Sequence, residues 1–202
     1  MNKSDKIIFG LFLVAFFPFF LSLTGIGIGY FFLSEKNMPY LFFAGLATGI
    51  IFDIISVRRM LSVMFDISFR TFAVFYIFCS IFLYGMFMGM PVPELVMGIA
   101  AGYYWGRRFI VKGTALPERE KMIRMVPRFT SFMMILICIS SAFIALREKT
   151  IGEELQGMLK LGFVPGKGLI IGGIIIGGSA LIIIQYFITR IVIVKTLKAG
   201  NG

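Results

Sequence analysis

Long apolar runs limit what this chain can fold into more than any other feature. Stretches of about 20 residues carry few charges, and a helix of that length crosses a hydrocarbon core of about 30 Å. Lipid offers no hydrogen-bond partner to a free backbone amide, so such runs are expected as helices. The predicted spans are residues 7–33, 39–57, 71–90, 93–111, 127–146 and 168–194.

These six spans predict an all-α, polytopic integral membrane protein with a single transmembrane domain over residues 1–202. The composition agrees, because 58% of the 202 residues are hydrophobic, against about 45–50% in soluble domains. The first span follows Lys3 and Lys6 as a signal peptide would, but it is too long for a signal sequence and no small-residue cleavage site follows it. We expect it to remain as a signal-anchor helix.

The net charge of +10 is spread unevenly along the chain. With a cytoplasmic N-terminus, 15 of the 20 lysines and arginines fall on inner segments, which is the positive-inside pattern. We therefore predict that both termini are cytoplasmic and that the protein lies in an inner (plasma) membrane of prokaryotic type. Topology and attraction to anionic lipid explain the charge, so no nucleic-acid partner is expected.

Three segments between the spans are predicted to lie at the membrane surface. Residues 151–161 form an outer amphipathic helix, with Thr150 as N-cap and Glu153 completing a capping box. Residues 57–70 and 112–126 form inner basic segments. The residues expected to contact anionic lipid are Arg58, Arg59, Arg107, Arg108, Lys112 and Arg124.

The three spans that run from outside to inside share a pattern, a proline followed by glycines four residues apart. Such glycines lie on one helix face and let two backbones approach closely. The pattern suggests three helical hairpins, and it leaves open whether the glycine faces pack inside the bundle, against a partner subunit or in a homo-oligomer. The predicted packing positions are Gly45, Gly49, Gly98, Gly102, Gly172, Gly173 and Gly177.

Candidate ligand-binding residues are the few polar or glycine positions in the spans, because ionisable groups at membrane depth are functional candidates. Asp53 also has a structural alternative, an ion pair with Arg107 or Arg108. Glu94 has another, since a carboxylate in a first helical turn is favoured by the helix dipole. The candidates are Gly25, Gly27, Gly29, Asp53, Glu94 and Gln185.

Several kinds of chemistry have no candidate residues. The chain has no histidine, and Cys79 and Cys138 are expected to be buried free thiols. Neither a metal site nor a cofactor is therefore expected. Paired carboxylates at working distance and phosphate-binding loops are also missing, so no catalytic residue is nominated.

Two classes of function fit these features, and we favour transport. The protein would be a transporter, a flippase or a membrane-embedded substrate-binding subunit, and its nearly uncharged interior favours an apolar or lipid-like solute. The alternative is a structural or assembly subunit that docks through its glycine-faced helices. An enzyme acting on lipid headgroups at the cytoplasmic face is a third, weaker hypothesis.

Overall fold

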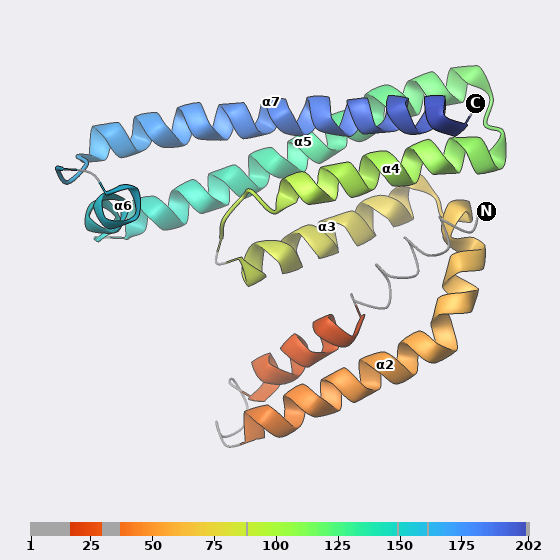
Figure 1. Cartoon of the computed structure of the whole chain (residues 1–202), viewed down its shortest axis with the longest axis horizontal. Helices are drawn as coiled ribbons and strands as arrows, with labels where there is room; N and C mark the ends of the chain where they lie inside the picture. The colour runs from red at the N-terminus through yellow and green to blue at the C-terminus, as the bar shows by residue number, and fades with distance from the viewer. Residues whose placement is uncertain (1–16, 30–36, 88, 149, 161, 201–202) are drawn as a thin grey trace. The chain divides into compact units, whose positions relative to one another are not determined.

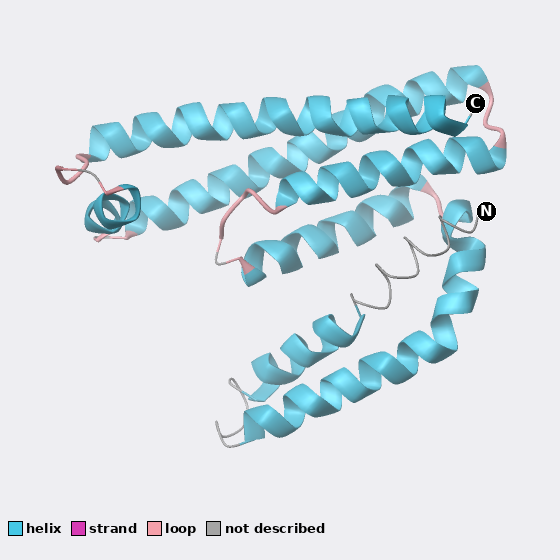
Figure 2. Ribbon diagram, viewed as in Figure 1, coloured by secondary structure: helices cyan, strands magenta, loops and turns pink. Residues whose placement is uncertain are grey.

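The fold is known from a computed structural model, which describes residues 17–29, 37–87, 89–148, 150–160 and 162–200. Within these ranges, nothing is said of the side chains of residues 57–62, 158 and 159. Every regular element in the described ranges is a helix, as the sequence predicts (Figure 2). The chain divides into two compact units, Met1–Ile67 and Ser68–Gly202.

The first unit contains a helical hairpin. The helix Phe17–Gly29 lies beside α2, Met38–Val63, and the short 3-10 helix η2, Met64–Asp66, follows (Figure 1). Small residues allow the close approach, because a side chain at Gly25, Gly45 or Gly49 would overlap backbone atoms of the facing helix. The predicted packing role of glycine thus has a geometric counterpart at Gly45 and Gly49.

The second unit is a bundle of four long helices and one short one. These are α3, Phe69–Met86; α4, Glu94–Lys112; α5, Leu116–Arg147; α6, Ile151–Leu159; and α7, Lys167–Gly200. The most extensive contact is between α4 and α7, and α5 packs on both. Figure 1 shows α5 and α7 continuing past the first residue of α4, with α6 at their far end.

Local signals in the sequence set several of these helix ends. The Ser68 hydroxyl accepts a hydrogen bond from the Thr71 amide and caps α3. Gly113 adopts a left-handed conformation and ends α4. The predicted capping box at α6 is not formed: the Thr150 hydroxyl donates instead to Glu154 Oε1, at 2.9 Å, and caps no backbone amide.

The protein is a helical membrane protein. Four of the described helices are long and apolar enough to cross a bilayer: residues Met38–Ser56 of α2, and α3, α5 and α7. The predicted first span, residues 7–33, lies largely outside the described residues. The predicted fourth span corresponds to α4, which carries Glu94, Arg107, Arg108 and Lys112 and is not one of the four.

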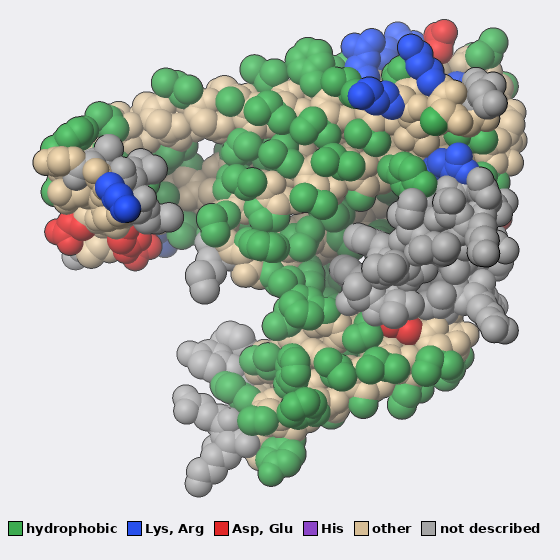
Figure 3. Space-filling view, viewed as in Figure 1, with side chains coloured by type: hydrophobic (Ala, Val, Ile, Leu, Met, Phe, Trp, Pro, Cys, Tyr) green, Lys and Arg blue, Asp and Glu red, His purple; other side chains and the backbone are tan. Residues whose placement is uncertain are grey.

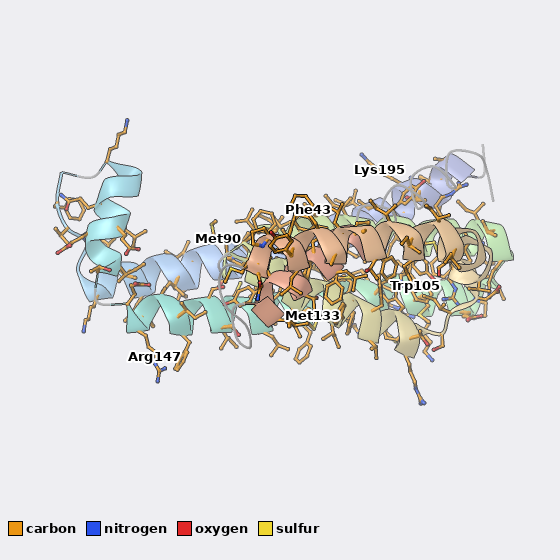
Figure 4. The ribbon with its side chains drawn as sticks, turned by 90° about the horizontal axis from the view of Figure 1, so that it is seen from below. Phe43, Met90, Trp105, Met133, Arg147 and Lys195 are labelled. Carbon is orange, nitrogen blue, oxygen red and sulfur yellow. The ribbon has the colours of Figure 1, made fainter. Side chains whose placement is uncertain are left out.

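Apolar and charged side chains occupy different parts of the surface. Apolar side chains cover much of the face seen in Figure 3, while lysine and arginine gather where α5 begins and α7 ends. Acidic side chains lie at the opposite end, over α6. Figure 4 shows Lys195 and Arg147 pointing away from the helices. This arrangement suits a bundle whose two ends face water and whose middle faces lipid.

Candidate functional site

Three glycines of α4 bring its backbone against α7. A Cβ atom on Gly102 would lie 2.7 Å from the carbonyl oxygen of Thr189, and one on Gly106 would lie 2.6 Å from Cβ of Thr196. A Cβ atom on Gly98 would lie 2.5 Å from Nε2 of Gln185. The residue numbers rise together on both helices, so α4 and α7 are parallel, and the space left by Gly98 is filled by the Gln185 amide.

This amide belongs to a buried polar centre, which consists of Tyr76, Ser80, Glu94 and Gln185. Nε2 of Gln185 donates to the backbone carbonyl of Glu94 at 3.2 Å and to the Tyr76 hydroxyl at 3.3 Å. The Ser80 hydroxyl donates to Oε1 of Glu94 at 2.7 Å. Glu94 is 3% exposed and Gln185 is 0% exposed, so α3, α4 and α7 together enclose the buried polar centre.

The centre lies at membrane depth. Helix α3 is 18 residues long, which is about 27 Å at about 1.5 Å per residue, close to a hydrocarbon thickness of about 30 Å. Ser80 is an interior residue of α3, and Gln185 lies inside the apolar part of α7. Glu94 is hydrogen-bonded to both, so its carboxyl lies level with the interior of these apolar helices rather than with their ends.

Helix α4 therefore begins inside the bundle, and the segment before it is held in place. The Ser141 hydroxyl of α5 donates to the Gly89 carbonyl at 2.5 Å. The Gly89 amide donates to the Tyr84 carbonyl at 2.9 Å, and Gly89 has a φ of +83°. Irregular backbone at membrane depth is stable only where protein or a cavity surrounds it, and α3 and α5 provide that contact here.

Two polar features of the centre lack the usual partner. Oε1 of Gln185 is buried and accepts no hydrogen bond. The Glu94 carboxyl accepts from the Ser80 hydroxyl, and no lysine or arginine of the described residues pairs with it. The site thus has a carboxyl and an amide oxygen in an apolar setting, with no counter-ion from the described part of the chain.

Helices α5 and α7 also share a smaller polar contact. The hydroxyls of Thr130 and Thr189 lie 3.2 Å apart, and both residues are 0% exposed. Thr130 also donates to the carbonyl of Pro127 at 3.1 Å, within its own helix. The bond between the two hydroxyls joins α5 to α7 one helical turn away from Gln185.

The remaining sequence candidates lie in different surroundings. Asp53 is in the first unit, and its carboxylate oxygens are buried without a hydrogen-bond partner. Arg107 and Arg108 are in the second unit, where Arg108 lies over the Trp105 ring at 4.5 Å. Because the two units are described separately, the ion pair of Asp53 with either arginine stays a prediction.

The glycine candidates divide into packed and open positions. Gly25 and Gly29 lie against Leu41 of α2, and the chain is helical from Phe17 through Gly29. Gly27 meets nothing within 4 Å. Three glycines of α7 likewise face open space in the structure: Gly172, Gly173 and Gly177.

The basic candidates lie on exposed or partly exposed surface where their side chains are described. Lys112 and Arg124 are exposed, and Arg107 and Arg108 are half-buried. The side chains of Arg58 and Arg59 lie outside the described residues. Among the described residues, no cluster of three or more histidine, cysteine, aspartate or glutamate side chains has the geometry of a metal site.

Tyr76 and Ser80 are the site residues that sequence reasoning missed. They lie four residues apart in α3 and hence on one helix face, a signal that was available in a span that is otherwise apolar. Cys79, a free thiol 1% exposed, lies next to them in the sequence. Comparison with known proteins adds nothing to this site, since no family model, curated protein or solved structure matches the chain.

Proposed function

We propose that this protein takes part in membrane transport, as a transporter, a flippase or a membrane-embedded substrate-binding subunit. The observation that carries the proposal is the buried polar centre at membrane depth, where Glu94 begins α4 and contacts Ser80. Polar and ionisable groups inside a membrane are expensive to bury, and they commonly mark the pathway of a solute or ion.

The start of α4 inside the bundle supports the same function. Helices that begin near the bilayer midplane are typical of transporter sites, because their free backbone amides and dipole act on the bound species there. Glu94 occupies the first turn of α4, with Tyr76 and Gln185 beside it. The surrounding helices are apolar, which suits an apolar or lipid-like solute whose polar end meets the amide and hydroxyls.

Native mass spectrometry of the full chain, extracted in a mild detergent, tests this function. We expect wild-type protein to retain a small molecule or lipid that is lost in Tyr76→Phe and in Gln185→Leu. Gln156→Leu, on α6, is the matched control and should retain it. If wild-type protein carries no adduct, or if all variants carry it equally, the transport proposal fails at this site.

A second candidate function is assembly, and one observation favours it. Gly173 and Gly177, four residues apart, leave an open strip on α7 with the open Gly172 beside it, whereas Gly98 and Gly102 are already packed. We propose that this strip contacts a second copy or a partner membrane subunit if the protein is an assembly subunit. Gly172→Ile or Gly177→Ile should then dissociate a defined oligomer, while Gly85→Ile, at an open position of α3, should not.

The proposed topology places six spans across an inner membrane, with both termini in the cytoplasm and basic surface against anionic lipid. It is supported by the gathering of lysine and arginine where α5 begins and α7 ends (Figure 3). Labelling of single cysteines introduced at Lys121 and Lys160 from either side of sealed vesicles tests it. We expect a cysteine at position 121 to react only from inside and one at 160 only from outside.

A further inference from the structure

We infer that Glu94 is a reversible proton-binding site within the membrane. The binding site itself follows from the buried polar centre, and its use for proton-coupled movement of a solute rests on the transport function proposed above. The bound species is a proton, held on the carboxyl group of Glu94. No other reactant is needed, because the proton adds to a carboxylate and leaves from the acid.

The first step of the argument is charge. The titratable groups of α3 that face Glu94 are Tyr76 and Cys79, and both are neutral when protonated. On the α7 side the nearest polar group is the Gln185 amide, and on the α5 side Phe129 packs on the Tyr76 ring at 5.5 Å. No cation in the described residues offsets an ionised Glu94, so burial in this apolar setting favours the protonated, neutral acid.

The second step is that the ionised form is also supported. The Ser80 hydroxyl donates to the Glu94 carboxyl at 2.7 Å, and a hydrogen bond donated to a carboxylate favours its charged form. Glu94 is also in the first turn of α4, where the helix dipole favours negative charge. Burial thus opposes the charge while Ser80 and the α4 N-terminus favour it, and this balance makes protonation reversible.

The third step concerns the neighbouring amide. Nε2 of Gln185 is occupied by Tyr76 and the Glu94 carbonyl, while Oε1 is buried with no donor. A protonated carboxyl carries a donor that an ionised one lacks. Protonation of Glu94 therefore supplies a hydrogen-bond donor to a centre in which the Oε1 acceptor of Gln185 is unused.

Infrared difference spectroscopy of the full chain in detergent measures this directly. The carbonyl stretch of a protonated carboxylic acid is followed from about pH 5 to about pH 9, a range that includes the pKa values documented for buried glutamates. We expect a band that disappears reversibly as the pH rises. It should be absent from Glu94→Gln and unchanged in Glu154→Gln, which alters an exposed glutamate of α6.

A second variant tests the proposal independently if Glu94→Gln does not fold. Ser80→Ala keeps the carboxyl but removes its hydrogen-bond donor, so the titrating band should shift in frequency and in midpoint pH. The proposal is overturned if wild-type protein shows no titrating band, if Glu94→Gln retains it, or if Ser80→Ala leaves it unmoved. A Glu94 that stays ionised throughout and responds to Na⁺ instead of pH also overturns it.

Proton flux separates this inference from the transport function. The protein is reconstituted into vesicles of phosphatidylcholine and phosphatidylglycerol that contain a pH-sensitive dye, and a pH step is applied outside. Flux in wild-type protein that is lost in Glu94→Gln supports coupling. A titrating band without flux would leave the proton-binding site standing and would contradict the proposed coupling to transport.

Discussion

Gly102 shows how much one missing side chain decides in this protein. The carbonyl oxygen of Thr189 and the side chain of Val192 occupy the space that a Cβ atom would need. Backbone atoms cannot rotate away as the end of a side chain can, so a substitution there must move one helix relative to the other. Gly172, on α7, has the opposite environment, because a Cβ atom there would meet no other part of the protein within 4 Å.

Gly102→Ala is therefore expected to destabilise the protein by about 1–3 kcal/mol, as overpacking does. Gly172→Ala should be neutral or stabilise by up to about 1 kcal/mol, because alanine is the better helix former and meets nothing. Unfolding of both variants by sodium dodecyl sulfate in mixed micelles measures the difference. Equal destabilisation of the two would contradict this account and indicate that α7 is covered.

Position 89 favours glycine for a different reason, since its φ of +83° lies in the left-handed region. An alanine there is expected to cost about 1–2 kcal/mol and to disturb the segment that leads into Glu94. Gly85→Ala is the matched control, because Gly85 is helical and has no neighbour within 4 Å. Thermal unfolding in detergent compares them, and a stable Gly89→Ala variant would show that the segment adapts freely.

At the scale of single residues, the sequence predicted which residues are candidates better than it predicted which of them lie together. Glu94 and Gln185 were both identifiable as polar residues in apolar spans, and the structure brings them together. The two residues are 91 positions apart in the chain, so no local pattern predicts their contact. The helix dipole also accounts for a glutamate in a first turn without placing it in the interior. The register of α4 on α7 and the bond from Ser80 show that Glu94 is internal, so the interior holds a carboxyl that the sequence alone did not place there.

Among the elements, the pair formed by α5 and α7 offers the cleanest test of membrane hydrogen bonding. The Thr130 and Thr189 hydroxyls lie 3.2 Å apart. A double-mutant cycle with Thr130→Val and Thr189→Val should give a coupling of about 0.6 kcal/mol, the average for such bonds in a membrane protein. Thr130 and Thr196, two turns further along α7, form the control pair and should be additive.

The elements also show where pattern reasoning has a natural limit. Residues 112–126 read as a basic surface segment separate from the span 127–146, yet α5 runs without a break from Leu116 to Arg147 with Pro127 inside it. A proline inside a membrane helix is tolerated when neighbouring groups satisfy the backbone. The same sequence cue, a proline after a charged run, fits either a boundary or a continuous helix.

For the whole molecule, the division at Ile67 and Ser68 has a measurable consequence. Trp105, the single tryptophan of the chain, is 1% exposed and packs against rings of the second unit: Phe69, Phe72, Tyr104 and Phe109. Its fluorescence therefore reports the folding of the second unit.

We expect the fragment Ser68–Gly202, produced in the same membrane and detergent, to show the blue-shifted tryptophan emission of the full chain. The buried polar centre also belongs entirely to this fragment, so the titrating infrared band should survive. Emission shifted to longer wavelength in the fragment would mean that residues 1–67 are needed to assemble the second unit. The Trp105→Phe variant of the full chain provides the blank.

The class of protein was within reach of the sequence at this largest scale, because runs of apolar residues report lipid exposure directly. The contacts between helices could not be predicted, since glycine spacing identifies a packing face of a helix but not the partner that packs there. Gly98 and Gly102 have a partner within the chain, whereas Gly172 and Gly177 do not within the described structure. Their sequence patterns are much alike.

The glycines of α4 that face α7 recur at every fourth position, Gly98, Gly102 and Gly106. Such a repeat looks nearly the same after a slide of four residues, about 6 Å at about 1.5 Å per residue. The bonds from Gln185 to the Glu94 carbonyl and to Tyr76 exist in one alignment alone. The hydrogen bonds of Gln185 therefore fix the register of α7 on α4, as a buried polar residue fixes the register of a coiled coil.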